Sequence, residues 1–478
     1  MHDLVIRNGL VVDGTGSAPR RADIAIDGGV ITAVGDITET GSREIDAADH
    51  IVTPGWVDVH THYDGQVSWD PVMAPSSQHG VTSVIMGNCG VGFAPVRPDA
   101  HEFLIELMEG VEDIPGSALN EGITWNWESF SEYLDALEVM PRTIDVGAQL
   151  PHAAVRAYVL GERAHEYDVT AAEIEQMVDI THDALTAGAF GFSTSRTFLH
   201  TSKHGLVPGT HSTPDEVIAI GEAVRDSGHA VFQYVSDDQG TGGDEPWLDT
   251  LTALGCPTTF TLAQTPAAPE AFRAVLDGAL ANTAAGSPMT PQVAVRPTGM
   301  LYGLQSSFHP FIAHPSYREI RDLPLAERAA MLCHPDVRQR LLSEDPFTEN
   351  RFAHYMATNW SQMYRLGDPP DYEPPLEASA ARARWCSIGW SKPTAKRSCS
   401  ARSATITSTT TMSFVKCSTI PQPCPVPLTA ALIAASSATQ AFRRTCSRTG
   451  PAIAAEARNS RLSVSCNSRR RRPPMPTA

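Results

Sequence analysis

The pattern of apolar and polar positions divides the chain into three parts. Residues 4–53 alternate short apolar runs with turns that contain Gly or Asp, which predicts a small β-sandwich over residues 1–55. From residue 56 to about residue 380, strand-like runs alternate with stretches of helical spacing such as 171–185, which predicts parallel βα units. Residues 381–478 follow neither period. Seven strands are expected in the middle part, at 57–62, 81–86, 143–147, 190–193, 230–233, 259–264 and 293–295.

The first of these expected strands carries the clearest candidate chemistry. Residues 57–62 read Val-Asp-Val-His-Thr-His and follow a Pro-Gly turn. Side chains of a strand alternate between faces, so His60 and His62 are expected to share one face. Two neutral imidazoles so placed can hold one metal ion, and zinc is a common choice. A bare His-x-His pair at a solvated strand end is the alternative, but the preceding turn and the apolar strand favour a metal site.

Composition and the lengths of apolar runs limit the location and the partners that the protein can have. The amino terminus lacks a basic region followed by an apolar run, and no stretch approaches the roughly 18 apolar residues of a membrane span, which predicts a cytoplasmic protein without a membrane partner. The formal net charge of −18 argues against nucleic acid as a partner, because phosphate binding needs a basic surface. The sequence does not indicate the oligomeric state.

The block around His60 and His62 resembles the first barrel strand of the amidohydrolase superfamily. The resemblance implies a metal-dependent hydrolase with a (β/α)₈ TIM-like barrel, in which the functional residues lie at the carboxyl ends of the strands. Cys89 follows the second expected strand in Gly87-Asn88-Cys89-Gly90 and could bind zinc as a thiolate, although a lone Cys is more often a buried apolar residue. The N-acyl-D-amino-acid deacylases use a Cys at this place as a ligand, so the resemblance adds Cys89 to the metal ligands.

Two further features bear on the branch of the superfamily and on the number of metal ions. Hydantoinase-like and dihydroorotase-like relatives bridge their metals with a carbamylated Lys after the fourth strand, whereas the first 380 residues here contain a single lysine, Lys203. The better-known deacylases also carry a His at the ends of the fifth and sixth strands, where this chain has Gln233 and Gln264. Because Gln is a poor zinc ligand, we expect one zinc ion rather than two.

Three residues are candidates for substrate contacts. Arg196 and Arg296 each follow an expected strand and could bind a substrate carboxylate through a two-pronged hydrogen bond. His152 lies just past the third strand, where a donor could polarise a carbonyl. An ordinary ion pair or a capped loop is the alternative for each.

The last part of the chain differs sharply from the rest. Residues 381–478 hold one acid, Glu456, against 16 Lys and Arg, so the tail carries +15 and the first 380 residues carry −33. Six of the nine cysteines also lie in this tail. A natural basic disordered tail is one interpretation, and it would be expected to bind polyanions.

A shifted reading frame is the interpretation that we favour for this tail. Regrouping the codons of residues 414–442 permits a run that contains S-D-G-G-A-H, which resembles the eighth barrel strand of the deacylases. In the printed frame, that Asp is replaced at about Thr429 and the His at about Ile433, and the break falls between Glu377 and Trp385. The barrel over residues 56–380 is therefore expected to be incomplete at its last strand, and the tail to be largely irregular.

These features predict metal-dependent hydrolysis of a linear amide bond in a small molecule, with an N-acyl-D-amino acid as the substrate class. In the family, an Asp after the eighth strand accepts the proton of the attacking water. The printed tail contains no Asp, so the printed chain is expected to be impaired and its catalytic residue stays unassigned. A cyclic amide hydrolase of the hydantoinase or dihydroorotase kind and a non-catalytic remnant of the family are the alternatives.

Overall fold

The computed structural model describes residues 1–237, 246–264, 269–294, 303–304 and 309–348, the single residues 354, 357 and 358, and the strand Val464–Ser465. Arg296 and the end of the expected strand 293–295 lie outside these residues, as does the tail from 381 onward apart from that strand. None of the described helices combines the length and the apolar character needed to cross a membrane.

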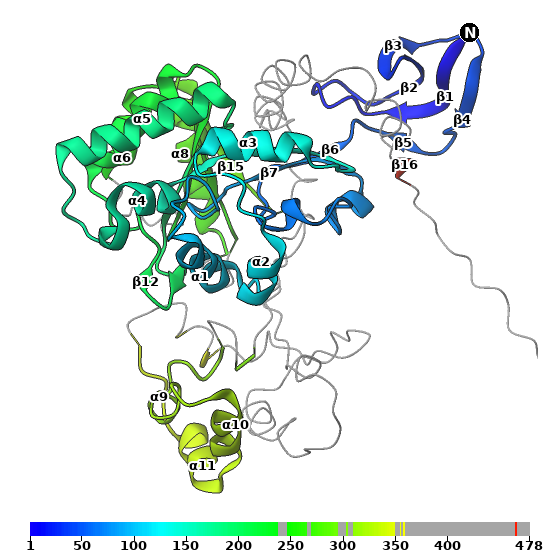
Figure 1. Ribbon diagram of the computed structural model, residues 1–478. Helices are drawn as coiled ribbons and strands as arrows, with labels where there is room; N and C mark the ends of the chain where they lie inside the picture. Colours follow the sequence, from blue (N-terminus) through cyan, green and yellow to red (C-terminus); the bar gives the residue numbers. More distant parts are fainter. Residues whose placement is uncertain are drawn as a thin grey trace, which may run out of the picture.

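The amino-terminal part forms one mixed sheet (Figure 1). The first two apolar runs, at 4–6 and 10–11, belong to a single strand, β1, which contains a bulge between Ile6 and Gly9. The described strands hydrogen-bond as a single sheet in the order β16-β5-β1-β2-β3, with β4 also paired to β1. The tail strand β16 pairs antiparallel with β5. The bounds are β1 His2–Val11, β2 Arg20–Asp27, β3 Val30–Gly35, β4 Gly41–Asp46, β5 Ile51–Val52 and β16 Val464–Ser465.

The middle part contains parallel strands that follow chain order. They form the sheets β6-β7-β8 and β9-β10-β13-β14-β15, and only Gln149 separates β8 from β9. Phe190 N donates to Ala148 O at 2.9 Å, so the two sheets continue into each other at this point. This is the sequential parallel order of a βα barrel. The bounds are β6 Trp56–Asp58, β7 Val81–Met86, β8 Asp145–Ala148, β9 Leu150–Pro151, β10 Gly191–Arg196, β13 Val231–Ser236, β14 Thr258–Thr261 and β15 Met289–Gln292.

Two of the expected strands are displaced. The strand expected at 57–62 ends at Asp58, because the Asp58 carboxylate accepts a hydrogen bond from His60 N and turns the chain out of the extended conformation. His60 and His62 therefore lie in the segment after β6. The strand expected at 293–295 is β15, several residues earlier, where its register with β14 begins at Met289.

No described strand pairs with the outer edge of β6 or of β15. Trp56 on β6 and Val293 just after β15 are 55% and 45% exposed. The described residues supply no strand between β6 and β15.

Helices pack outside the parallel strands and contribute to the main core (Figure 1). The helix expected at 171–185 is confirmed as α5, which starts with a capping box between Thr170 and Glu173 and ends at Gly188, whose φ is 119°. The bounds are α1 His101–Glu112, α2 Gly116–Gly122, α3 Phe130–Val139, α4 His152–Leu160, α5 Ala171–Ala187, α6 Pro214–Asp226, α7 Pro246–Ala253, α8 Ala271–Ala284, α9 Pro315–Arg318, α10 Leu325–Cys333 and α11 Pro335–Ser343; short 3₁₀ turns lie at Gln66–Ser68, Ser76–His79 and Gly161–Arg163, and a hairpin joins β11 Thr201–Ser202 to β12 Gly205–Leu206.

Candidate metal centre

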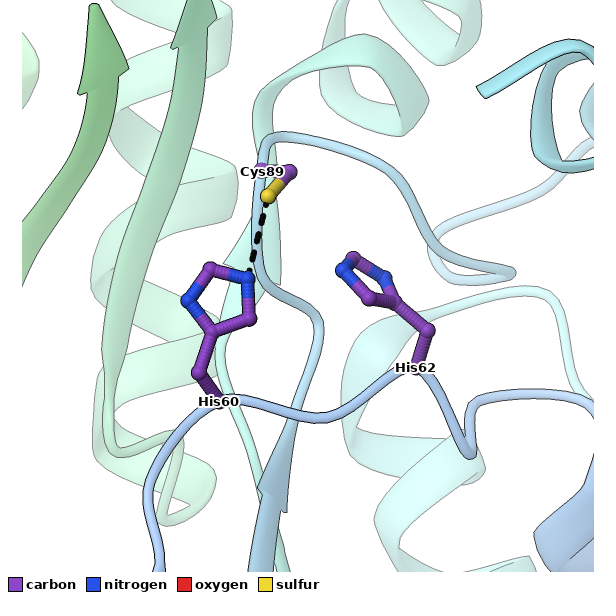
Figure 2. Close-up of side chains that lie close together, drawn as sticks. All are labelled: His60, His62 and Cys89. Atoms are coloured by element: carbon purple, nitrogen blue, oxygen red, sulfur yellow. Dashed lines mark hydrogen bonds between the residues drawn. The ribbon is translucent and has the colours of Figure 1, made fainter. Parts of the chain in front are cut away.

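Three sequence-predicted ligands converge beyond the carboxyl ends of β6 and β7. One ligand atom each from His60, His62 and Cys89 lies within 4.8 Å of the other two, and His60 Nε2 is 3.2 Å from Cys89 Sγ. Figure 2 shows both imidazoles on one segment and extending toward Cys89. Ligands of one tetrahedral zinc ion lie about 3.3–3.7 Å apart, given bonds of about 2.0–2.3 Å. Small side-chain rotations would therefore bring all three donors onto one ion.

The loop after β7 holds Cys89 in place through its backbone. Cys89 has a φ of 57°, and its amide donates to Gln233 Oε1 at 3.0 Å. Gly90 approaches β10 so closely that a Cβ would lie 2.9 Å from Ser195 N, which excludes any larger residue there. These contacts involve the backbone of the turn and do not use the sulfur, which faces His60 Nε2.

The two histidines present the electron pairs that a metal requires. His60 Nδ1 donates to Gln292 Oε1 at 2.7 Å, which leaves the lone pair on Nε2, the nitrogen that faces Cys89. His62 Nδ1 is buried and has no hydrogen-bond partner among the described residues. A buried nitrogen without a partner, a thiol and an oriented imidazole form a donor set that suits zinc.

Burial controls the protonation of this cluster. It lowers the pKa of His60 to about 4, with a further contribution from His62, and it lowers the pKa of His62 to about 4. Both rings are therefore neutral at pH 7. Burial also raises the pKa of the Cys89 thiol well above its usual value, and the nearby Glu112 and Asp64 carboxylates add to this effect. A bound cation would reverse this effect on the thiol, because a coordinating thiol is deprotonated.

Two further donors, which the sequence did not reveal, adjoin the cluster. Glu112 and His200 each place a ligand atom within 4.8 Å of Cys89 and of each other, and Glu112 Oε1 is 3.2 Å from His62 Nε2. Burial raises the pKa of Glu112 and lowers that of His200 to about 4. His200 follows β10, so its place after a strand was a usable signal. Glu112 ends a helix, and no local pattern marked it.

Asp64 lies in the same segment as the two histidines and is also buried. Its Oδ2 atom has no hydrogen-bond partner among the described residues, and burial raises its pKa to about 8. A protonated Asp64 is the form that this environment favours near neutral pH. The sequence offered the spacing His-Thr-His-Tyr-Asp as a signal for this residue, but gave no reason to expect its burial.

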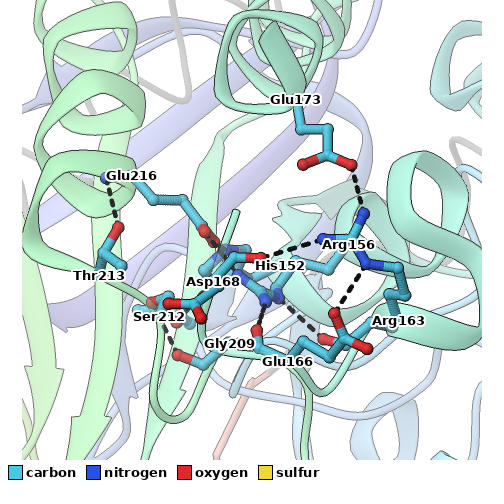
Figure 3. Close-up of polar contacts among 12 residues, drawn as sticks. His152, Arg156, Arg163, Glu166, Asp168, Glu173, Gly209, Ser212, Thr213 and Glu216 are labelled. Carbon is cyan, nitrogen blue, oxygen red and sulfur yellow. Dashed lines mark hydrogen bonds and ion pairs between the residues drawn. The ribbon is translucent and has the colours of Figure 1, made fainter. Parts of the chain in front are cut away.

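Two of the expected substrate contacts, His152 and Arg196, form hydrogen bonds with residues outside this cluster. His152 is buried and binds on both sides, with Nδ1 2.8 Å from Thr194 Oγ1 and Nε2 2.7 Å from Glu216 Oε1 (Figure 3). Arg196 Nη1 donates to Gly209 O and Ser212 Oγ, both at 3.2 Å. The other arginine named as a substrate contact lies outside the described residues. Substrate contact by these residues stays a prediction.

The glutamines expected in place of strand-end histidines have structural partners. Gln233 Oε1 accepts the Cys89 amide, whereas Gln264 Nε2 donates to Pro269 O at 2.7 Å. Lys203 is 61% exposed and pairs with Glu106 on α1. Lys203 lies in the turn of the β11–β12 hairpin, not at the end of β10.

The chain is similar in sequence to two curated proteins. An uncharacterised protein of Mycobacterium tuberculosis is 39% identical over 202 residues, which cover 40% of this chain and 32% of that protein. The D-aminoacylase of Alcaligenes xylosoxydans is 29% identical over 237 residues, which cover 49% of this chain and 45% of that enzyme. The chain thus spans less than half the length of either curated relative.

A solved structure and a family match complete the comparison. The crystal structure of N-acyl-D-glutamate deacylase from Bordetella bronchiseptica, complexed with zinc and a phosphonate inhibitor, is 26% identical with a TM-score of 0.50, covering 65% of this chain and 61% of that one. Residues 43–395 match the amidohydrolase family. This match covers well over half of the chain, so the protein belongs to the amidohydrolase family and shares its metal-dependent TIM-barrel fold with the D-aminoacylase-like branch.

Proposed function

We propose that this protein uses zinc to hydrolyse a linear amide bond in a small molecule, with N-acyl-D-amino acids as the substrate class. The observation that carries the proposal is the convergence of His60, His62 and Cys89, whose ligand atoms all lie within 4.8 Å of one another. The similarity to a D-aminoacylase and to a zinc-containing N-acyl-D-glutamate deacylase supports both the metal and the substrate class.

Two of the three proposed ligands have a defined support in the chain. His60 is oriented by Gln292, and Cys89 is held by the hydrogen bond from its amide to Gln233. Such outer contacts fix the orientation of a ligand and typically change metal affinity by about 10–100-fold. When bound, zinc supplies a Lewis acid that polarises the scissile carbonyl and activates water.

The position of Lys203 favours a linear over a cyclic amide. Cyclic-amide hydrolases of the superfamily rely on a modified lysine between their metals. The lysine available here is solvent-exposed and paired with Glu106, outside the cluster of ligands. A linear acyl-amino acid therefore agrees better with the described site.

We propose further that the printed chain has reduced activity. The proton acceptor expected after an eighth strand would have to come from residues beyond 380, and the printed tail contains no Asp. Loss of a single proton shuttle typically costs about 10²–10⁴ in rate. A chain translated in the alternative frame from about residue 380 should therefore be faster by that factor.

The test measures zinc content and amide hydrolysis together. Zinc is measured by elemental analysis and activity with N-acetyl-D-amino acids, for both the printed and the frame-restored chain. The variant is His60→Ala with His62→Ala, and the matched control is His334→Ala, which removes an exposed histidine far along the chain. We expect the double variant to lose zinc and the control to keep it.

Two results would contradict the proposal. If the double variant retains the zinc content of the parent chain, His60 and His62 do not form the metal site. If the frame-restored chain binds zinc but hydrolyses no linear amide, while it opens a hydantoin or dihydroorotate ring, the cyclic-amide alternative is correct. If it binds zinc and hydrolyses neither, the protein is a non-catalytic member of the family.

A further inference from the structure

We propose that Asn88 positions the metal ligands by joining two parts of the chain, the histidine segment (residues 60–62) and the cysteine turn (residues 87–90). This inference rests on the proposed zinc site and adds the residue that sets the separation between its two parts. Asn88 directly precedes the ligand cysteine, and its Nδ2 atom donates to Thr61 O at 3.2 Å. Thr61 lies between the two ligand histidines. One hydrogen bond therefore links the immediate chain neighbours of all three proposed ligands.

The Asn88 side chain is fully buried, and both of its polar atoms are bonded. Besides Thr61 O, Nδ2 donates to Ile85 O near the end of β7, at 3.0 Å. The Oδ1 atom accepts from Gln149 Nε2 at 2.7 Å. Burying an amide is costly unless it is hydrogen-bonded, so an apolar residue would suit a position that only had to be filled. The three bonds therefore indicate that this amide has a specific role.

The histidine segment depends on such contacts because it lies outside the sheet. Strand β6 ends at Asp58, two residues before the first ligand. Thr61 then donates twice to Ile85 O, from its amide at 3.0 Å and from its hydroxyl at 2.8 Å. Asn88 binds the remaining polar group of Thr61, its carbonyl oxygen. The backbone between the two imidazoles is thus held by the end of β7 and by the cysteine turn.

The cysteine turn is itself anchored to the barrel on its other side. Ser193 on β10 donates through its hydroxyl to Gly87 O and accepts from Gly90 N at 3.0 Å. Ala153 on α4 donates from its amide to Gly90 O at 2.9 Å. Gly87 has a φ of 74°, and a Cβ there would lie 2.2 Å from Gln149 O, so this part of the turn has no room to move toward Gln149. Asn88 therefore connects an anchored turn to the histidine segment.

The separation between these two parts decides whether the thiolate and the imidazoles can share one ion. His60 Nε2 lies 3.2 Å from Cys89 Sγ, close to the separation of about 3.3–3.7 Å between ligands of one tetrahedral zinc ion. Zinc–ligand distances vary by only about 0.2 Å. The two histidines move together because they lie on one segment. Loss of the Asn88 bridge should therefore weaken the bond from Cys89 to the metal more than the bonds from the histidines.

The experiment measures metal binding and the thiolate ligand in the full chain. One variant is Asn88→Asp, which keeps the size of the side chain but replaces its donating NH₂ group by an acceptor oxygen. The second is Asn88→Ser, which removes the bridge without adding a charge. The matched control is Thr181→Val, which removes a buried hydrogen bond from Thr181 Oγ1 to Met177 O within α5.

Three readouts that do not depend on turnover are compared. Affinity for zinc and Co²⁺ is measured by chelator competition, the thiolate ligand by the thiolate-to-cobalt absorption band, and the histidine segment by hydrogen exchange of the Thr61 amide in the metal-free chain. We expect both Asn88 variants to bind metal about 10–100-fold more weakly, with a weaker thiolate band and faster exchange at Thr61. Thr181→Val should match the parent chain in all three, whatever its Tm.

The possible failures are distinguishable. If the Asn88 variants lower the Tm but keep the parent's metal affinity and thiolate band, Asn88 only supports packing, and this inference is overturned while the zinc site stands. The same conclusion follows if both Asn88 variants fail to fold whereas Thr181→Val folds, or if Thr181→Val weakens metal binding as much as they do. If the parent chain binds no metal, the proposed function fails together with this inference.

Discussion

Replacing Glu216 by Gln should destabilise the barrel, because this residue is the centre of a buried ionic network. Glu216 accepts two hydrogen bonds from Arg156 Nη1, at 2.5 and 2.6 Å, and lies 2.7 Å from His152 Nε2 (Figure 3). The side chains of Arg156 and Glu216 are 1% and 0% exposed. Glutamine keeps the shape of the side chain but removes its charge.

The magnitude follows from what remains buried after the change. Arg156 would still donate to the carbonyl oxygens of Ala164 and Glu166, but its positive charge would have no anionic partner. Removing one member of a buried ion pair costs about 3–5 kcal/mol. The retained amide oxygen still accepts a hydrogen bond, so we expect about 3 kcal/mol. The site should loosen too, because Ala153 on α4 donates to Gly90 O beside the candidate ligand loop.

The assay is native-state hydrogen exchange, with the amide of Ala153 as the local reporter. A loss of about 3 kcal/mol corresponds to exchange faster by about two orders of magnitude, if exchange follows the opening equilibrium. The control is Glu222→Gln, an exposed residue on the same helix. If both variants exchange alike, or if Glu216→Gln costs less than about 1 kcal/mol, the Arg156–Glu216 pair does not hold this part of the barrel together.

Four further changes have defined outcomes. Cys89→Ser should weaken zinc retention in elemental analysis, whereas a merely packed cysteine would change thermal stability alone. Gln292→Ala frees His60 Nδ1 and should weaken zinc binding about 10–100-fold in a chelator competition. Gly209→Ala should lower the Tm, because φ is +97° and the new Cβ would lie 2.5 Å from His152 Nδ1; an unchanged Tm would show that the loop adapts. In the folded chain, burial lowers the pKa of His152 below its ordinary value of 6.5. The unfolded chain therefore takes up the proton first, and the stability contributed by the neutral ring of His152 falls as the pH drops below about 6.5. Urea titrations at several pH values should show a steeper slope in the parent chain than in His152→Asn, which keeps the contribution of His60, His62 and His200.

The sequence predicted the elements that depend on local patterns. Alternation of apolar runs located the parallel strands, and helical spacing located α5 at Ala171–Ala187. Motif spacing paired His60 with His62, the family resemblance added Cys89, and the structure brings the ligand atoms of all three together. Such features are readable because neighbours in sequence decide them, through the period of a strand or helix and through turn residues.

Sequence reasoning failed where a particular hydrogen bond or a long-range contact decides the outcome. The register of β15 depends on its pairing with β14, and the end of β6 depends on a local hydrogen bond from His60 N to the Asp58 carboxylate; no apolar pattern reports either. The same is true of Glu112 and His200, which lie 88 positions apart in the numbering and meet because α1 packs on the β11–β12 hairpin.

His152 also shows that the local sequence does not reveal the partners of a polar side chain. Its place after the third strand made it a candidate substrate contact, with an ordinary ion pair or capped loop as the alternative, and the structure gives its ring Thr194 and Glu216 as partners. A polar residue after a strand can face a site or a buried partner, and the local sequence is the same in both cases. His152 begins α4 and lies between Thr194 of β10 and Glu216 of α6, so only the three-dimensional packing supplies the partners that its buried ring requires.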